Sequence, residues 1–313
     1  MRAVGGRGKR VAVSAEGTGR EGRPVVTTPK DLLIAWLRRQ LEEPVRQWLD
    51  EQLARLGPKS PDRELYVAIG MAPRRLGKDD LALSEADLEQ ARTARPGWDP
   101  QGLSLDEAAR IVFLLHAGGD GGRFALRFRQ LCRTADVGEL VAFYRGLPLY
   151  PGPELLEAQA GEAARTNMKG VFEALAHRNP YPMEQFGENR WNHLVLKALF
   201  VGSALHPIQG LDRRANPGLA RMLRDYAHER WAAGRPVSPE LWRCVGPFAI
   251  KADALSDLQR VLASGSTREQ SAAALALAAS SAPEAKDLLA SLPDLAAAIE
   301  RGEISWARLA PEA

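Results

Sequence analysis

The sequence predicts an all-α protein, built either as a HEAT-like, solenoid-like stack of antiparallel helical hairpins or as an irregular multi-helix bundle. From Pro29 onward, Leu, Ala, Arg and Glu dominate, and all four are strong helix formers. No run of β-branched residues alternates with the period of two that a half-buried strand needs. Helical segments of roughly 10 to 18 residues follow one another on short connections, so consecutive helices are expected to lie antiparallel. Because no strict repeat is visible, the HEAT-like stack is inferred from helix lengths alone.

The N-terminal half contains seven segments with helical periodicity. Pro44 is expected to kink or split the first of them. Ser104 and Glu107 form a capping-box pattern at the start of the fourth, and the Gly-rich stretch 117–122 is expected to be a tight turn between two helices. The last is expected to be one long helix. The segments are 30–57, 61–77, 84–97, 104–117, 123–135, 137–147 and 153–177.

In the C-terminal half, one helix is predicted to begin near Gly187 and another after Asn216. Asn216 suits the N-cap, since its side chain can accept a backbone hydrogen bond, and Pro217 suits the first helical position. Short helices with Pro or Ser starts are then expected, and Ala-rich residues 250–310 favour close helix approach. The segments after Asn216 are 217–240, 238–248, 253–263, 267–280, 283–293 and 294–310.

Composition predicts a soluble globular protein, and the length permits one elongated domain or two compact ones. Hydrophobic residues make up 45% of the chain and charged residues 26%, as in ordinary globular proteins. No apolar run approaches the 18 or so residues that cross a bilayer, and the start has no apolar signal core, so a cytoplasmic location is expected. We expect residues 1–28 to be a disordered basic tail and residues 29–313 to form one all-α domain.

Charge and cysteine content exclude several classes of function. Residues 1–30 carry seven basic and two acidic side chains, so the rest of the chain is slightly acidic although the whole has a formal charge of +3. Nucleic-acid binding by a broad basic face is therefore not expected. Cys132 and Cys244 have no metal-ligand or redox spacing and are expected to be buried thiols in a reducing compartment.

One stretch, residues 176–200, combines many polar side chains with residues apolar enough to be buried. On a helical wheel starting near Gly187, Asn189, His193 and Lys197 stand at i, i+4 and i+8 and form a narrow polar stripe beside a broad apolar face. Since the helix is apolar nearly all round, we expect it to be largely buried. Buried polar groups need partners, because an unpaired one costs about 1 to 3 kcal/mol.

Polar residues on neighbouring segments are expected to join this stripe. Asn179 precedes a proline and cannot easily stay helical, so the loop after it holds the preceding helix end close to the next helix. A second stiff loop, and the helix after it, supply further histidines and charges. We expect all of these groups to gather in one solvent-reachable hollow. The candidate ligand-binding residues are His177, Asn179, Asn189, His193, Lys197, His206, Asp212, Arg213, Asp225, His228, Glu229 and Arg230.

Three interpretations of this cluster compete. It is a buried network that fixes how helices dock. Or it is a pocket for a small anionic or hydroxylated metabolite, with Lys197, Arg213 and Arg230 as anion contacts and His193 and Asn189 as orienting groups. Or His193 or His228 is a general base tuned by Asp225 or Glu229.

No cofactor is predicted. A zinc or iron site would have to use the histidines at 177, 193, 206 and 228, and no pair of these has HxH, HExxH or ExxH spacing. The sequence also has no Gly-rich phosphate loop after a strand and no GxSxG motif. The common catalytic templates are absent, so the catalytic residues are unknown.

The signature region, residues 177–248, resembles the EboA family of bacterial metabolite traffic proteins. The likeness is carried by "NPYP", "WN", "LKALF", "GLDRRANPGLARMLRDYAHERWAAGR" and "SPELWR". Looser similarity extends through most of the chain after residue 30. Residues 74–103 and the basic tail show no such likeness.

The resemblance implies a process and no catalytic assignment. Similar proteins are associated with gene clusters for secondary metabolism that also encode a membrane prenyltransferase and several soluble enzymes. The resemblance therefore implies a cytoplasmic protein that binds a small metabolite or hands it over, with other proteins of the same gene cluster, including the membrane prenyltransferase, as partners. A pathway enzyme using a His/Asp/Lys acid-base cluster, and a non-catalytic scaffold for partner enzymes, are the alternatives.

Overall fold

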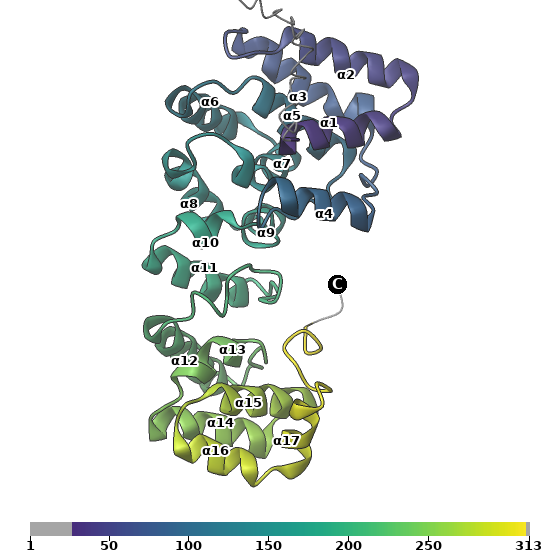
Figure 1. Cartoon of the computed structure of the whole chain (residues 1–313). Coiled ribbons are helices and arrows are strands. Elements are labelled where there is room, and N and C mark those ends of the chain that lie inside the picture. The colour runs from purple at the N-terminus through teal and green to yellow at the C-terminus, as the bar shows by residue number, and fades with distance from the viewer. Residues whose placement is uncertain (1–26, 311–313) are drawn as a thin grey trace, which may run out of the picture.

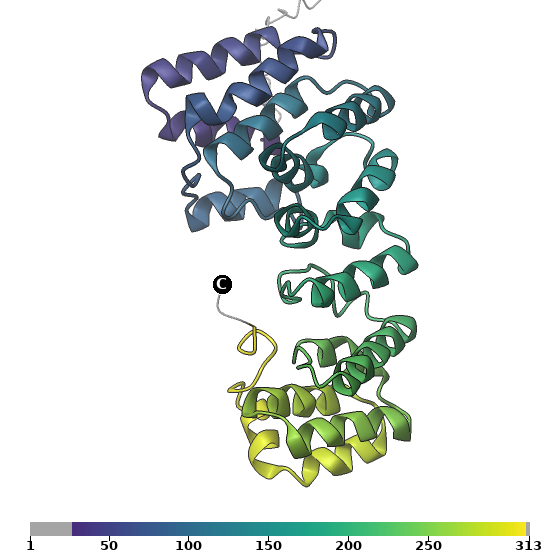
Figure 2. The same ribbon diagram turned by 180° about the vertical axis from the view of Figure 1, so that it is seen from behind.

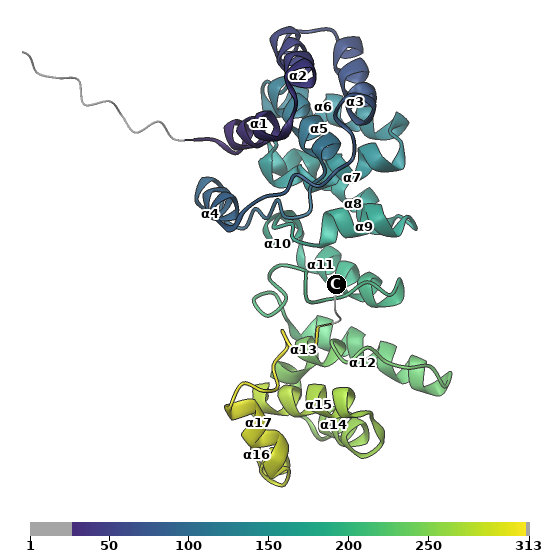
Figure 3. The ribbon, with the colours of Figure 1, turned by 90° about the vertical axis from the view of Figure 1, so that its right-hand side faces the viewer.

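The computed structural model describes residues 27–310, and this part of the chain is all-α, with no strand. Its helices follow one another along a curved, elongated array (Figure 1). Helices α1 to α7 form one end, α8 to α13 form a narrower middle, and α14 to α17 form the other end. The view from behind and the side view show the same stacking in chain order (Figures 2 and 3). The predicted fold class is confirmed.

The N-terminal end follows the predicted segments closely. Pro44 splits the first segment, since α1 ends at Gln40 and α2 begins at Glu43 with the proline at its second position. The predicted capping box is present, because the Ser104 side chain accepts from the Glu107 N–H. The helices are α1 (Pro29–Gln40), α2 (Glu43–Arg55), α3 (Asp62–Leu76), α4 (Glu85–Ala94), α5 (Leu105–His116), α6 (Gly121–Thr134) and α7 (Val137–Arg145).

The middle of the array corrects two predictions. The long helix predicted over 153–177 is wrong: Thr166 is extended, with ψ 150°, and its hydroxyl accepts the Met168 N–H, so the side chain competes with the helical hydrogen bonds. The loop after Asn179 also contains an unpredicted short helix. The elements are η1 (Leu147–Leu149), η2 (Pro153–Leu156), α8 (Glu157–Arg165), α9 (Lys169–Ala176), α10 (Tyr181–Gln185), α11 (Glu188–Phe200) and α12 (Pro217–Ala232).

The C-terminal end is a compact group of short helices. Residues 301–310, predicted to continue the last helix, are turns instead, and they reach back toward the middle of the array (Figures 1 and 2). The segment 217–240 stops being helical at Ala232, two residues before Gly234 with φ +64°. The elements are α13 (Leu241–Val245), η3 (Gly246–Phe248), α14 (Ala252–Ser264), α15 (Thr267–Ala279), α16 (Pro283–Ala290) and α17 (Pro293–Glu300).

A single hydrophobic core runs through the described residues, from Leu32 to Ala285. Within this core each helix packs mainly on the helices next to it in the array, for example α3 on α5, α7 on α9 and α14 on α15. The predicted tail, residues 1–28, lies outside the described residues except for Thr27 and Thr28. Thr28 is the N-cap of α1, with Asp31 completing a capping box.

Candidate functional site

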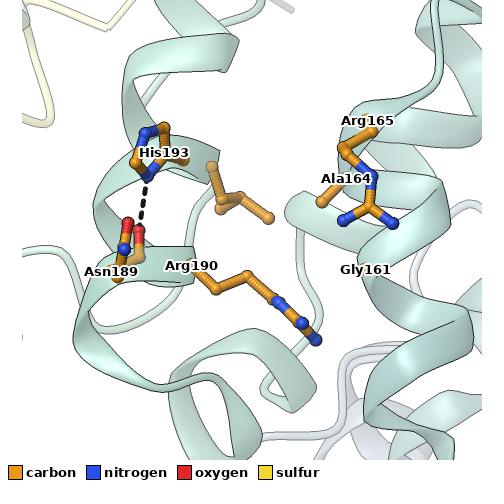
Figure 4. A pocket seen from close by; sticks show the side chains of 7 residues that line it. Gly161, Ala164, Arg165, Asn189, Arg190 and His193 are labelled. Atoms are coloured by element: carbon orange, nitrogen blue, oxygen red, sulfur yellow. Dashed lines mark hydrogen bonds between the residues drawn. The ribbon is translucent and has the colours of Figure 1, made fainter.

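An open groove lies between α8 and α11, in the middle of the array. Its volume is about 360 Å³, within the range of small-molecule sites. Figure 4 shows Arg190 extending from α11 into the gap, and Arg165 on α8 at the opposite side of the gap. The groove brings together two of the predicted site residues. Its lining residues are Gly161, Ala164, Arg165, Asn189, Arg190, His193 and Leu194.

Helix α11 is placed by one buried face. It begins where predicted, with Gly187 as N-cap, and it buries Trp191, Leu194 and Val195 against the core. Asn189 and His193 then point outward, because they are offset from that face on the 3.6-residue period. The predicted polar stripe is therefore real. The expectation that the helix is largely buried holds for one face only: Asn189 and His193 are exposed, and Phe200 at the helix end is 74% exposed.

Arg190 crosses the floor of the groove and is held from α8. Its Nη1 donates to the Glu157 carbonyl oxygen at 2.7 Å and lies 3.1 Å from the Glu157 carboxylate. Its guanidinium also lies over the Phe186 ring, 5.4 Å from the centroid. A Cβ added at Gly161 would come within 3.0 Å of the same guanidinium. The missing side chain at Gly161 therefore gives Arg190 its space.

Arg165 is the second cation of the groove, and it is easily redirected. Its side chain is 62% exposed and pairs with Glu162 one turn earlier on α8. Such exposed pairs contribute only about 0 to 1 kcal/mol. An anion in the groove can therefore compete with Glu162 for this guanidinium.

The imidazole of His193, at the rim of the groove, is held in one tautomer. Its Nδ1 lies 2.8 Å from the Asn189 carbonyl oxygen, and a carbonyl can only accept, so Nδ1 carries the proton in the neutral ring. Nε2 is then the acceptor that remains. The partner is a backbone carbonyl, so the structure does not support tuning of His193 by Asp225 or Glu229.

Lys197 lies one turn beyond His193, at the end of the groove. Its Nζ donates to the Asn167 Oδ1 at 3.3 Å and lies 5.9 Å from the Phe200 ring centroid. It does not line the cavity itself. The predicted stripe thus runs along the outer side of α11, and its first two members border the groove.

The remaining predicted residues do not join this groove, so the expectation of one shared hollow is wrong. His177 ends α9, with Nε2 3.0 Å from the Ala204 carbonyl oxygen, and lines a different, smaller cavity. Asn179 is 3% exposed, and its amide donates to the carbonyls of Tyr144 and Ala174 and accepts from the Tyr181 N–H. Asn179 is therefore a buried structural residue.

The loop between α11 and α12 is fixed by pairs within the signature region. Asp212 forms a bidentate ion pair with Arg243, at 2.7 and 2.6 Å. The backbone N–H of His206 donates to the buried Glu240 carboxylate, whose other oxygen accepts from the Leu205 N–H. Arg213 is exposed and contacts the Met183 sulfur. Asp212, predicted as a ligand contact, and the backbone of His206 therefore hold the loop in place.

Asn192 and Asn216 join α11 to α12. Each side-chain amide donates to the other, at 3.2 and 2.8 Å, and Asn216 also accepts from the Leu219 N–H as the predicted N-cap. Asn192 is 5% exposed. The buried polar residue of α11 is thus Asn192, not the Asn189 that the wheel indicated.

On α12 the predicted carboxylate partners are not the ones that the structure forms. His228 Nε2 lies 2.7 Å from Asp257 of α14, and Arg224 Nε lies 2.7 Å from the other oxygen of the same carboxylate. Asp225 and Glu229 are exposed. Arg230 donates to the Pro236 carbonyl at 3.0 Å and pairs with no carboxylate among the described residues. These contacts join α12 to the C-terminal end.

Histidine geometry gives no metal centre in the described residues. No group of three His, Cys, Asp or Glu side chains among residues 27–310 is close enough to hold a metal ion. His177, His193, His206 and His228 each contact a different partner. Burial lowers the pKa of His177, although nearby Glu173 acts in the opposite direction, so its ring is neutral at pH 7.

Sequence reasoning missed the two groove arginines and the carboxylate that holds His228. Arg190 lies inside the signature region, between Asn189 and Trp191, but the helical wheel assigned it neither to the apolar face nor to the polar stripe. Arg165 is on a helix predicted to run on unbroken, so nothing in its sequence surroundings marked it. Asp257 lies beyond the signature.

Comparison with known proteins gives one finding. A family model described as metabolite traffic protein EboA matches residues 29–246, which is more than half of the chain. No curated protein and no solved structure matches it. In the described residues, every helix is too short or too polar to cross a membrane.

Proposed function

This chain belongs to the EboA family, and on that premise we propose that it binds a small anionic metabolite in the groove between α8 and α11 and hands it over within a traffic pathway. The observation that carries the proposal is the pair of arginines, Arg165 of α8 and Arg190 of α11, that line one open cavity from two helices. Ala164 and Leu194 supply the apolar part of the lining. Guanidinium groups match carboxylate and phosphate oxygens in charge and in geometry.

The rim supplies groups that suit a hydroxylated ligand. Nε2 of His193 is an acceptor because Nδ1 is engaged with the Asn189 carbonyl, and the Asn189 side chain offers an amide donor and acceptor. The groove therefore presents cations at its floor and neutral hydrogen-bonding groups at its edge. This combination supports an anion that also carries hydroxyl groups.

Handover is supported by the openness of the site. Arg165, Asn189 and His193 are all exposed, so a ligand can enter and leave without a large rearrangement of the array. We place the protein in the cytoplasm, in a secondary-metabolite pathway, with other proteins of the same gene cluster as partners, a membrane prenyltransferase among them. The curved helical array offers these partners a long surface.

The test uses a substitution that moves Arg190 without removing any charge. In Gly161→Ala, the new methyl group would lie 3.0 Å from Nη1 of Arg190, so the guanidinium must shift. Gly70→Ala in α3 is the matched control, because a Cβ there meets nothing within 4 Å. Both variants gain about 0.5 to 1 kcal/mol of helix propensity, so stability alone does not separate them.

The readout is the set of small molecules that the purified protein retains from an extract of the producing strain, identified by mass spectrometry. We expect the wild type and Gly70→Ala to retain the same anionic compound in equal amounts. Gly161→Ala should retain at least about tenfold less of it, which is the effect of one charge-assisted hydrogen bond. Equal retention by both variants would place the ligand elsewhere.

A further inference from the structure

A second polar cavity lies between α7 and α9, apart from the groove already described. Its volume is about 210 Å³, enough for a molecule of a few heavy atoms. None of the groove's lining residues takes part in it. The lining residues are Val141, Arg145, Gly170, Glu173, Ala174, His177 and Arg178.

Arg178 occupies a backbone conformation that normally belongs to glycine. Its φ is +51°, in the left-handed region where a side chain costs roughly 1 kcal/mol or more. The conformation is held because the Arg178 N–H donates to the Pro207 carbonyl at 2.9 Å and His177 pairs with Ile208 in an isolated antiparallel bridge. Glycine would take this conformation without strain. The arginine at this position is therefore unfavourable for the fold, and its side chain needs another explanation.

The guanidinium of Arg178 forms one long ion pair among the described residues. Its Nε lies 3.9 Å from the Asp99 carboxylate, and both side chains are partly exposed, so an anion in the cavity can compete with Asp99 for this guanidinium. Arg145 stands beside it, and three of its N–H groups are engaged, by the carbonyls of Gln101 and Gly102 and the carboxylate of Glu107. Burial, and to a smaller extent the neighbouring Arg178, lowers the pKa of Arg145 against the opposing effect of Glu107. Two cations thus face one cavity with room for an anion.

His177 adds a hydrogen-bond acceptor of known tautomer. Its Nε2–H donates to the Ala204 carbonyl at 3.0 Å, so Nδ1 carries the lone pair in the neutral ring. Nδ1 has no hydrogen-bond partner in the described part of the chain, and it is not among the fully buried unpaired atoms. It is available to a ligand hydroxyl.

Glu173 limits the charge that the cavity accepts. Its Oε1 accepts from the Ser203 hydroxyl at 2.8 Å and lies 3.7 Å from Lys169. The carboxylate borders the same cavity as Arg178, so a ligand with two negative charges would be repelled at one end. The lining therefore favours a monoanion.

We propose that this cavity binds a small hydroxycarboxylate monoanion. The carboxylate contacts Arg178, with Arg145 beside it, and the hydroxyl group donates to Nδ1 of His177. This site is independent of the groove between α8 and α11 and of the metabolite proposed there.

The experiment compares two glycine substitutions at left-handed positions. Arg178→Gly removes the guanidinium and the strain together. Ala82→Gly relieves strain at the other described non-glycine residue with positive φ, at +45°, which is exposed and distant in sequence. The probes are glycolate and acetate, which differ by one hydroxyl group, titrated into the full-length protein and followed by NMR.

We expect both variants to keep or raise the wild-type Tm, because both relieve strain. Wild type and Ala82→Gly should bind glycolate saturably, at least about fivefold more tightly than acetate, as expected for one hydrogen bond of roughly 1 kcal/mol. Arg178→Gly should bind glycolate at least about tenfold more weakly. Equal glycolate binding by Arg178→Gly, equal affinity for acetate, or no saturable binding would overturn the proposal.

Discussion

The two sides of helix α11 use polar residues in opposite ways. On the inner side, Asn192 is buried and forms a reciprocal amide pair with Asn216. On the outer side, Asn189 and His193 are exposed and border an open groove. The adjacent residues Asn192 and His193 thus have different roles: Asn192 fixes the neighbouring helix, and His193 is free to contact a ligand. The type of residue does not distinguish these roles, whereas burial and partners do.

The comparison extends to the whole signature region. Asn179, Asn216, Asp212 and Glu240 all hydrogen-bond within the chain, and these contacts fix the ends of α9, α11 and α12. Most of the signature is therefore explained by the fold. Binding, in this account, depends on a few residues that the fold leaves open.

The largest effect is expected for Asn179→Ala. The substitution leaves the carbonyls of Tyr144 and Ala174 and the N–H of Tyr181 without this partner in a buried place. Each unpaired buried group costs about 1 to 3 kcal/mol, so we expect a loss of about 3 kcal/mol in the free energy of unfolding, measured with urea. A loss below about 1 kcal/mol would contradict the assignment of Asn179 to the fold.

A smaller loss is expected for Glu240→Gln. The buried carboxylate accepts one N–H on each oxygen, and an amide can accept only with one of its two terminal atoms. We expect the free energy of unfolding to fall by about 1 to 3 kcal/mol, again measured with urea. Asp212→Asn is the matched control, because the Asp212 carboxylate is exposed and its ion pair should contribute about 0 to 1 kcal/mol.

On the open side the expected pattern is reversed. His193→Gln and Lys197→Met alter exposed or half-buried side chains, so each should change the free energy of unfolding by no more than about 0.5 kcal/mol. His193→Gln should nevertheless weaken metabolite retention about fivefold, as expected for one neutral hydrogen bond, and lower pathway output. Lys197→Met should have a lesser effect, because Lys197 lies beyond the cavity. Reduced stability with unchanged retention would assign these residues to the fold.

The smallest effect concerns pH. Because burial lowers the pKa of His177 in the folded state, the unfolded chain takes up a proton first as the pH falls below about 6.5. The contribution of neutral His177 to the free energy of unfolding is therefore fully present above about pH 6.5, and it is lost as the pH falls toward the folded-state pKa. Urea midpoints at about pH 7.5 and 5.5 should therefore differ less in His177→Gln than in the wild type. An equal pH dependence in both would contradict a buried, neutral His177.

Periodicity and capping residues were sufficient for the order of most helices and for part of the site. The start of α11 near Gly187, the cap at Asn216 and the alignment of Asn189 and His193 along one side of the helix were all predictable, because each depends on neighbours within about four residues. The break at Thr166 was missed because a single hydroxyl decides it.

What a helical wheel cannot provide is the partner across the interface. It gives the direction of Asn192 and His228 on their own helices, but their partners, Asn216 and Asp257, lie 24 and 29 residues further along the chain. The wheel also cannot show that Arg190 lies in space left by a glycine on another helix. The prediction of a single hollow is wrong for this reason: residues that are close in the sequence lie in different parts of the helical array.

The most direct test of the division between fold and site is the amount of metabolite retained per mole of folded protein in Asn179→Ala and His193→Gln. The account predicts that Asn179→Ala, although less stable, retains the wild-type amount once only folded protein is counted, and that His193→Gln, although as stable as the wild type, retains about fivefold less. The opposite pattern, with full retention by His193→Gln and loss by folded Asn179→Ala, would contradict it.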